Sequence, residues 1–411
     1  MGPITLFDKS FIQSLSLDES VWFDHFFLTN VCPLFYVETL ADLDKSGLKG
    51  RSPEEEVRII ADKFPEMNSG PCAHHVDLCI ANLQGFDVPM TGQIPLAHAR
   101  LVMHEGRPSA FSEESPVAQA FSRWQAGNYL EVEHLFARAW RDALVDLDLD
   151  NRRDLFEAIG IDTETCRTLE DARNLAASVI SSDEAPLNCL NYGFTGLGVP
   201  ATEQAKILSR WESLGNPKIQ DFARYAAFML SVELFFDIAL ETGLISPNPP
   251  ANRIDIAYLF YLPFCMVFTS SDRLHRRTAP LFLRHNQEFI WGPDLKVSLS
   301  EINLFFSLYP DSEKEKGLNR LAPFPPTSVD TLVSELWDRH LPSWRDGPKP
   351  DPTVPKQVPT DIISKVDQIQ QAQPIKPDPD TFRTEDIEST IIKRVVRRRK
   401  GAWYQIPKDI T

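Results

Sequence analysis

A chain of 411 residues is longer than most single domains, which predicts either two domains or one domain with a large insertion. Hydrophobic residues make up 43% and charged residues 24%, values typical of globular proteins, so disorder of the whole chain is excluded. The formal net charge of −16 disfavours a simple nucleic-acid binder, because phosphates attract basic surfaces, but it is compatible with clustered carboxylates or with plain solubility.

Cysteine usage and the N-terminus bear on the compartment. The six cysteines are scattered without a Cys-x-x-Cys pair, and the N-terminus has no basic region followed by a long apolar stretch. Because a secreted, disulfide-bonded protein shows the opposite pattern, we expect a cytoplasmic location. Residues 225–245 are apolar but carry three acids along one side of a helix, and the apolar residues 254–268 are too few to cross a bilayer of roughly 30 Å. We therefore expect no membrane span.

The first fifty residues alternate between strand-like and helix-like patterns. The apolar run Ile4–Phe7 predicts a buried strand, and Val31–Val37 predicts a second strand with Pro33 near its beginning. Periodicity and capping residues predict helices at residues 11–17, 20–27 and 38–43.

From about Ser52 the pattern is mostly helical. The run Ser52-Pro53-Glu54-Glu55 is typical of a helix start, with a proline and acids in the first turn. Periodicity predicts helices at residues 74–83, 117–124, 131–147, 169–180, 202–214 and 219–244, and a short strand at residues 100–103.

The α/β pattern returns after a Pro-rich break at residues 246–250. We predict a helix at Arg253–Leu259, a buried strand at Cys265–Phe268, a helix from Arg273 and an edge strand at Glu288–Trp291. The expected organisation is an α/β core from residues 1–50 and 246–343, a helical insertion at 51–245, a Pro-rich linker at 344–390 and a basic tail at 391–411.

Charge is distributed unevenly along the chain. From Arg345 onward there are 13 Lys and Arg against 10 Asp and Glu, a net charge of +3, whereas the preceding residues carry −19. The basic tail and its aromatic residues could follow a phosphate backbone and stack on bases. Alternatively, residues 391–396 form a strand docked on an acidic partner or on the protein's own surface. The nucleic-acid contacts predicted in the tail are Lys393, Arg394, Arg397, Arg398, Arg399, Lys400 and Trp403.

Four acidic residues each lie at the end of a predicted strand or at the start of an adjacent helix: Asp8, Glu38, Asp255 and Asp272. In an open parallel sheet the carboxyl ends of the strands form the crevice where ligands bind, so these residues are expected to converge. Carboxylates that face one crevice repel one another unless a hard cation such as Mg²⁺ or Mn²⁺ lies between them. Further oxygen ligands or supporting groups are expected at Ser10, Asp42, Thr269 and Ser271.

The opening ITLFDKS and the closing DIAYLFYLPFCMVFTSSDR resemble the PIN-like family of metal-dependent nucleases. In that family an Asp ends the first strand, a Glu begins an early helix, an Asp starts a later helix, and a Thr/Ser-x-Asp follows the fourth strand. The resemblance matches these positions to Asp8, Glu38, Asp255 and Asp272, and covers about residues 1–45 and 250–295. It implies a Rossmann-like α/β core with a parallel sheet, interrupted here by about 210 residues between Glu38 and Asp255.

The resemblance implies an endoribonuclease that binds Mg²⁺ or Mn²⁺ through these four carboxylates and acts on RNA, or less readily on DNA. A second hypothesis is a non-catalytic scaffold of the same fold that recruits a protein partner through its helical insertion or its tail. A third is a phosphatase-like enzyme acting on small substrates. Each acid also has a purely structural interpretation, because an Asp after a strand commonly caps a helix or a turn.

A zinc site is a further alternative. Cys72, His74, His75 and Cys79 lie within eight residues, but a closed zinc site needs four suitably spaced ligands, and this run has no spaced partner pair elsewhere. We expect the start of a helix here, with Cys79 in the core.

Overall fold

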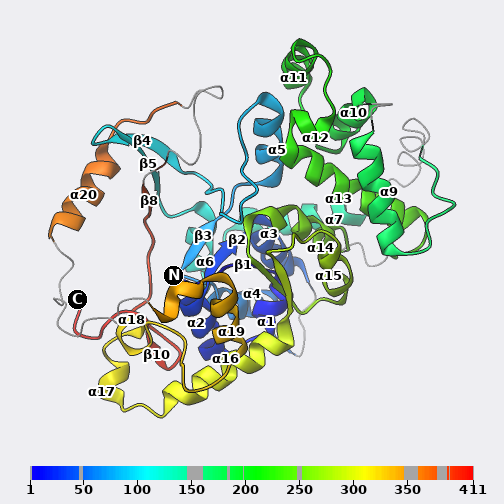
Figure 1. Ribbon diagram of the computed structural model, residues 1–411. Helices are drawn as coiled ribbons and strands as arrows, with labels where there is room; N and C mark the ends of the chain where they lie inside the picture. Colours follow the sequence, from blue (N-terminus) through cyan, green and yellow to red (C-terminus); the bar gives the residue numbers. More distant parts are fainter. Residues whose placement is uncertain are drawn as a thin grey trace.

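The computed structural model of the protein has a mixed α/β fold (Figure 1). It describes residues 2–45, 50–145, 161–182, 186–197, 199–247, 252–346, 360–376, 387 and 389–410. Within these ranges no helix is long and apolar enough to cross a membrane.

A five-stranded, fully parallel sheet organises the fold. Its middle strand is β1 (Ile4–Phe7); β2 (Leu28–Val31) and β3 (Ser69–Pro71) lie to one side, and β6 (Val267–Ser270) and β7 (Glu288–Trp291) lie to the other. The strand order reverses between β1 and β6, which is where ligands bind in open parallel sheets, beyond the carboxyl ends of the strands. The third strand, β3, comes from within residues 51–245, so part of the range expected as a helical insertion belongs to this sheet.

The strand predicted at Val31–Val37 is wrong. The strand β2 ends at Val31, and Pro33 instead begins helix α3 (Pro33–Ala41). Proline suits the first turn of a helix, because its fixed φ matches the helix and its missing N–H would have no partner there. The buried strand predicted at Cys265–Phe268 exists, but it lies two residues later, as β6.

Successive side chains of β1 point to opposite faces of the sheet, and each face is covered by a hydrophobic cluster. Ile4 and Leu6 belong to one large hydrophobic cluster, and Phe7 belongs to another. In the second cluster the ring of Phe7 packs edge-on against Phe23 and Phe35, with centroids 5.7 and 5.1 Å apart. The molecule is therefore a layered structure with helices on each face of the sheet.

The Ile4 and Leu6 face packs against a helical layer, seen at the upper right of Figure 1. The helix predicted at residues 219–244 is broken at Ala223, whose backbone is extended, giving α12 and α13. This layer contains α5 (His75–Gln84), α9 (Leu169–Ser181), α10 (Pro186–Leu197), α11 (Ala201–Ser213), α12 (Ile219–Phe222), α13 (Arg224–Glu241), α14 (Asn252–Tyr258) and α15 (Arg273–Thr278).

The Phe7 face packs against helices from both ends of the chain. As expected, Ser52 caps α4: its hydroxyl accepts from the Glu55 N–H while the Glu55 side chain accepts from the Ser52 N–H. This layer is drawn from α1 (Lys9–Ser14), α2 (Leu17–Phe26), α3, α4 (Pro53–Asp62), α6 (Pro116–Gln125), α7 (Glu131–Val145), α16 (Gly292–Ser307), α18 (Leu318–Leu321) and α19 (Leu332–His340), with α17 (Asp311–Lys314) beside it.

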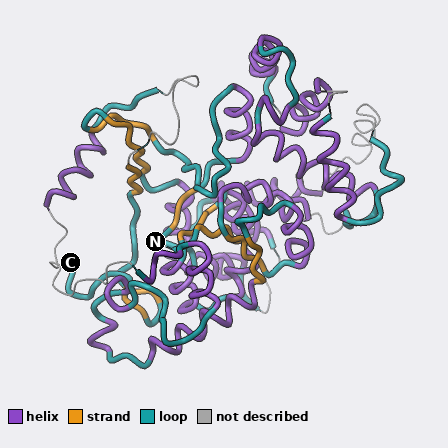
Figure 2. The backbone as a smooth tube through the Cα atoms, in the orientation of Figure 1, coloured by secondary structure: helices purple, strands orange, loops and turns teal. Residues whose placement is uncertain are grey.

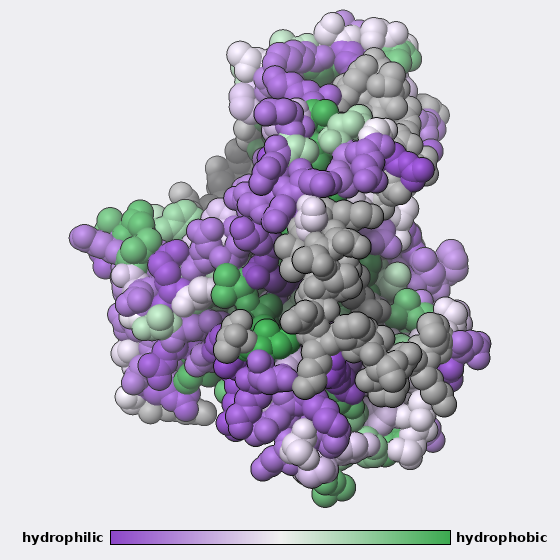
Figure 3. All heavy atoms as spheres, turned by 90° about the vertical axis from the view of Figure 1, so that its left-hand side faces the viewer, coloured by the Kyte–Doolittle hydropathy of each residue, from purple (hydrophilic) through white to green (hydrophobic). Residues whose placement is uncertain are grey.

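The C-terminal residues return to the body of the protein. Figure 2 shows a small sheet, apart from the central one, in which β8 (Ser389–Ile392) pairs in parallel with β5 (Arg107–Ser112), beside β4 (Arg100–His104). Helix α20 (Thr360–Gln371) packs on β4, and β9 (Arg399–Lys400) pairs with β10 (Trp403–Tyr404). The face seen in Figure 3 is mostly hydrophilic, with apolar residues in small separate groups.

Candidate functional site

Asp8 lies at the carboxyl end of β1, as predicted. It caps α1, accepting a hydrogen bond from the Phe11 N–H at 2.9 Å. The hydroxyls of Ser10 and Ser270 each donate to the other carboxylate oxygen at 2.7 Å. Ser270 is the last residue of β6, so this bond joins the two strands at which the sheet order reverses.

Asp272 follows β6 and caps α15. Its Oδ1 accepts from the Leu274 N–H at 2.6 Å, and its own N–H donates to the Ser270 hydroxyl at 2.9 Å. Because Ser270 also donates to Asp8, one serine connects the two predicted acids. Asp8 and Asp272 thus both cap helices, as the structural interpretation of these acids expects.

His275 lies in the middle of this centre, although the sequence analysis did not single it out. Its Nδ1 is 3.2 Å from Asp8 Oδ2, and its Nε2 donates to the Asp255 carbonyl at 2.6 Å. Burial lowers the pKa of His275, but the hydrogen bond and charge of Asp8, together with Asp255, outweigh it and raise the pKa to about 9. In return, Asp8, whose pKa burial would raise, has a lowered pKa because of its bonds to His275, Ser10 and Ser270.

Glu38 projects from α3 and accepts a hydrogen bond from the Tyr258 hydroxyl at 2.5 Å. Lys9 donates to the Glu38 backbone carbonyl at 3.1 Å and pairs with Asp42 at 2.9 Å. Burial raises the pKa of Glu38, and the charge of Asp8 raises it further. Lys9 and the hydrogen bond from Tyr258 lower it, but the pKa stays above its usual value. Asp42 thus belongs to the same cluster, as a partner of Lys9.

Asp255 lies on α14 and is the least stabilised of the four acids. Among the described residues no hydrogen bond reaches its carboxylate, although its backbone carbonyl is bonded by His275. Burial, then the charges of Glu38, Asp272 and Asp8, raise the pKa of Asp255 to about 8, against the opposing charge of His275. The structure therefore brings Asp8, Glu38 and Asp272 within electrostatic reach of Asp255.

Two further buried hydroxyls lie in the segment that carries Ser270 and Asp272. Thr269 Oγ1 and Ser271 Oγ are buried and have no hydrogen-bond partner in the described part of the chain. Gly292 packs against Ser271 so closely that a Cβ at this position would lie 2.3 Å from the Ser271 hydroxyl. The Ser271 N–H donates to Ser10 at 3.1 Å, which links this segment back to Asp8.

The chemistry of these groups fits a hard divalent cation, because the carboxylates and unpartnered hydroxyls offer only oxygen ligands. As the side chains lie, however, the residues that the structure describes contain no group of three or more His, Cys, Asp and Glu placed to hold a metal ion. Positive charge in the centre comes from His275 beside Asp8 and from Lys9 beside Asp42. Cation binding would therefore require Asp8 to exchange its His275 partner.

The predicted nucleic-acid contacts of the basic tail divide into two groups. Arg397 pairs with Glu66 at 2.7 Å and with Asp62 at 3.1 Å, and the Arg394 guanidinium donates to the Met67 carbonyl at 2.7 Å. The first group is buried or partly buried and consists of Arg394, Arg397, Lys400 and Trp403. The second group is exposed and consists of Lys393, Arg398 and Arg399. The first group is thus engaged with the body of the protein.

The zinc alternative has little chemical support. Cys72 and Cys79 are buried, and burial raises the pKa of both thiols, whereas zinc binds the thiolate. His75 begins α5, with its Nδ1 3.1 Å from the Tyr261 hydroxyl.

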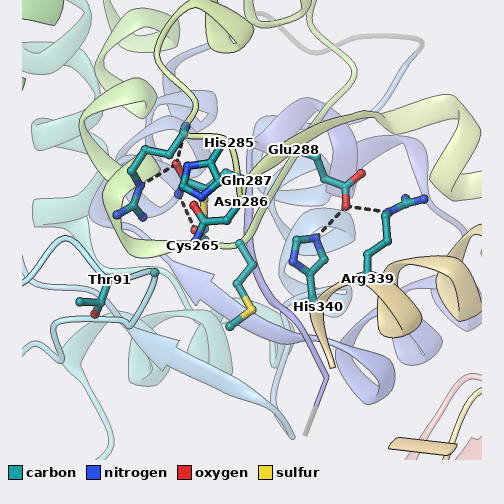
Figure 4. Close-up of a pocket in the computed structure, with 11 residues that line it drawn as sticks. Thr91, Cys265, His285, Asn286, Gln287, Glu288, Arg339 and His340 are labelled. Carbon is teal, nitrogen blue, oxygen red and sulfur yellow. Dashed lines mark hydrogen bonds and ion pairs between the residues drawn. The ribbon is translucent and has the colours of Figure 1, made fainter. Parts of the chain in front are cut away.

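A cavity of about 450 Å³ lies at the opposite edge of the sheet, beside the residues that precede β6 and begin β7 (Figure 4). Glu288 there accepts from His340 at 2.7 Å and from Arg339 at 3.0 Å. Gln287 donates to the Leu262 and Cys265 carbonyls at 2.6 Å. Because Glu288 and Gln287 are already hydrogen-bonded within the protein and the cavity lies away from the carboxyl ends of the strands, the acidic centre is the stronger candidate.

Comparison of the chain with protein-family models, with curated proteins and with solved structures finds no match in any of the three. The function must therefore be argued from the acidic centre itself.

Proposed function

We propose that the protein is a PIN-like, metal-dependent nuclease that hydrolyses phosphodiester bonds in RNA. The observation that carries this proposal is the placement of Asp255 among Asp8, Glu38 and Asp272 where the strand order reverses, a placement that also contributes to the raised pKa of Asp255. Burial first, and then the charges of the neighbouring acids, disfavour the ionised form of Asp255, and ionisable groups perturbed in this way cluster at functional sites. Binding a divalent cation is the use that their oxygen chemistry fits.

In this proposal Asp8, Glu38, Asp255 and Asp272 hold Mg²⁺ or Mn²⁺. The cation, when bound, supplies an activated water and neutralises charge on the phosphate. Asp8 and Asp272 are held in place by the helices that they cap. Asp255, without a hydrogen bond to its carboxylate among the described residues, is the acid most free to turn towards a ligand.

A non-catalytic scaffold is the second candidate, and one observation favours it. His275 and Lys9 already compensate Asp8 and Asp42, so part of the centre is stabilised by the protein's own cations. In a scaffold these contacts would be permanent and purely structural.

Cleavage of labelled single-stranded RNA, with Mn²⁺ or with EDTA, separates the two candidates. The nuclease proposal expects cleavage by the wild type only with Mn²⁺, and at least a hundredfold slower cleavage by Asp255→Asn and Asp272→Asn. Asparagine keeps the shape of each side chain, and it also caps helices, so the fold should survive at position 272. The matched control is Asp311→Asn, an exposed acid in α17. No cleavage by folded wild type, or equal cleavage by all four proteins, would favour the scaffold.

A further inference from the structure

An exposed basic surface adjoins the acidic centre. Helix α15 begins immediately after Asp272 and exposes Arg273, Arg276 and Arg277. Among the described residues no carboxylate lies within ion-pair distance of these arginines, although the chain carries a net charge of −16. By contrast, Arg339, Arg345 and Arg397 are each paired with an acid.

Trp291 lies beside these arginines at the carboxyl end of β7. Its register partner in the neighbouring strand is Ser270, whose hydroxyl donates to Asp8. The Arg276 guanidinium lies over the indole of Trp291, 4.8 Å from the ring centroid. An aromatic ring orients a guanidinium in this way without neutralising its charge, so Arg276 remains able to bind an anion.

We propose that Arg273, Arg276, Arg277 and Trp291, here called the α15 surface, bind the backbone and bases of a single-stranded nucleic acid flanking the acidic centre. Guanidinium groups bind phosphates through paired hydrogen bonds, and a partly exposed indole offers a stacking plane. A polynucleotide places several phosphates next to the one at the acidic centre, whereas a small phosphate ester would leave most of the arginines unused. This inference deepens the proposed nuclease function, since it names how the substrate strand is held.

Fluorescence anisotropy with labelled single-stranded RNA, in EDTA so that no cleavage occurs, tests the α15 surface. Replacing Arg273, Arg276 and Arg277 together by Gln should weaken binding at least tenfold at 100 mM salt. The slope of log affinity against log salt should fall by about 2, because each phosphate contact to a single strand contributes roughly 0.7. Trp291→Ala should weaken binding severalfold with less effect on this slope, because stacking involves no counterion release.

The matched control removes the same charge elsewhere, by replacing the exposed Arg58, Arg167 and Arg320 with Gln. The inference expects this variant to bind within about threefold of the wild type. It is overturned if the wild type does not bind, if the two triple variants lose affinity equally, or if only the control variant loses affinity. Melting temperatures confirm that both variants are folded, and a single-stranded DNA of the same sequence shows whether the 2′-hydroxyl contributes.

The binding assay and the cleavage assay can fail separately. Binding that depends on the α15 surface in a protein that never cleaves RNA would reject hydrolysis and keep this surface. Metal-dependent cleavage with unchanged binding in the α15 variant would reject this surface and keep hydrolysis.

Discussion

His275 supplies positive charge beside Asp8 in the acidic centre. Its imidazole contacts Asp8 through Nδ1 and the Asp255 carbonyl through Nε2, and these contacts raise its pKa to about 9. A histidine three residues after the Asp that caps a helix lies within the first turn of that helix, which is the signal in the sequence that could have identified His275. Its burial and its partners, however, depend on how three separate segments pack.

The raised pKa values of His275 and Asp255 predict how stability depends on pH without metal. His275 binds its proton more tightly in the folded state, so its contribution is complete below pH 6.5 and is lost as the pH rises through about 9. Asp255 stays protonated in the folded state to about pH 8 but ionises near 4 when unfolded, so it also makes stability fall with rising pH. In EDTA the free energy of unfolding should therefore decrease by roughly 3–5 kcal/mol between pH 6.5 and 9.

Urea unfolding at several pH values measures this decrease, with His275→Gln as the comparison. Because glutamine cannot titrate but can still donate to Asp8, the variant should show a clearly shallower pH dependence. Equal slopes in the two proteins would show that His275 is not the group responsible.

At the scale of elements, the sequence predicts those parts of the fold that carry local signals. The strands β1 and β7, the caps of α1, α4 and α15, and most helices follow from apolar runs, periodicity and capping residues. The strand β2 was missed because Thr29 and Asn30 interrupt its apolar pattern. Asn30 is fully buried, and its amide donates to the Phe264 carbonyl at 2.9 Å. This hydrogen bond joins distant parts of the chain, so a local sequence pattern cannot predict it.

The candidate site was predictable to a similar degree. Asp8, Glu38, Asp255 and Asp272 could be named because strand ends in a parallel sheet converge on one edge. Their compensating partners, Lys9, Tyr258 and His275, could not be named, because each contact depends on side-chain direction in the folded protein.

The junction between β7 and α16 gives a prediction at this scale. A Cβ on Gly292 would lie 2.3 Å from the Ser271 hydroxyl, 3.0 Å from the Phe11 ring and 3.1 Å from the Ser270 backbone. Because backbone and core must move to accommodate it, Gly292→Ala should destabilise the protein by about 1–3 kcal/mol in urea unfolding. Gly196→Ala is the control, since a Cβ there meets no atom within 4 Å of the described structure and alanine favours the helix. Equal stability of the two variants would contradict the close packing.

Across the whole molecule, the C-terminal segment is part of the folded body. Trp403 is buried against Trp22 of α2, with ring centroids 4.6 Å apart. The two indole N–H groups donate to the same oxygen of Asn303 in α16, at 2.9 and 3.0 Å. Residues near the start and the end of the chain thus form one cluster with Asn303 of α16.

Trp403→Ala should therefore destabilise the entire protein, by about 3–5 kcal/mol, because it removes a large buried side chain from this cluster. Chemical unfolding followed by circular dichroism measures the change. Val395→Ala is the control, since Val395 is 67% exposed in the same segment. A loss below about 1 kcal/mol for Trp403→Ala would mean that the tail is an appendage.

We propose that four carboxylates from distant parts of the chain form one cation site. Calorimetric titration of Mn²⁺ into the wild type, Asp255→Asn and Asp311→Asn measures cation binding without a need for substrate or activity. We predict saturable binding by the wild type and by Asp311→Asn, and at least tenfold weaker binding by Asp255→Asn. Absence of saturable binding by the wild type, or equal affinity in all three proteins, would contradict the claim.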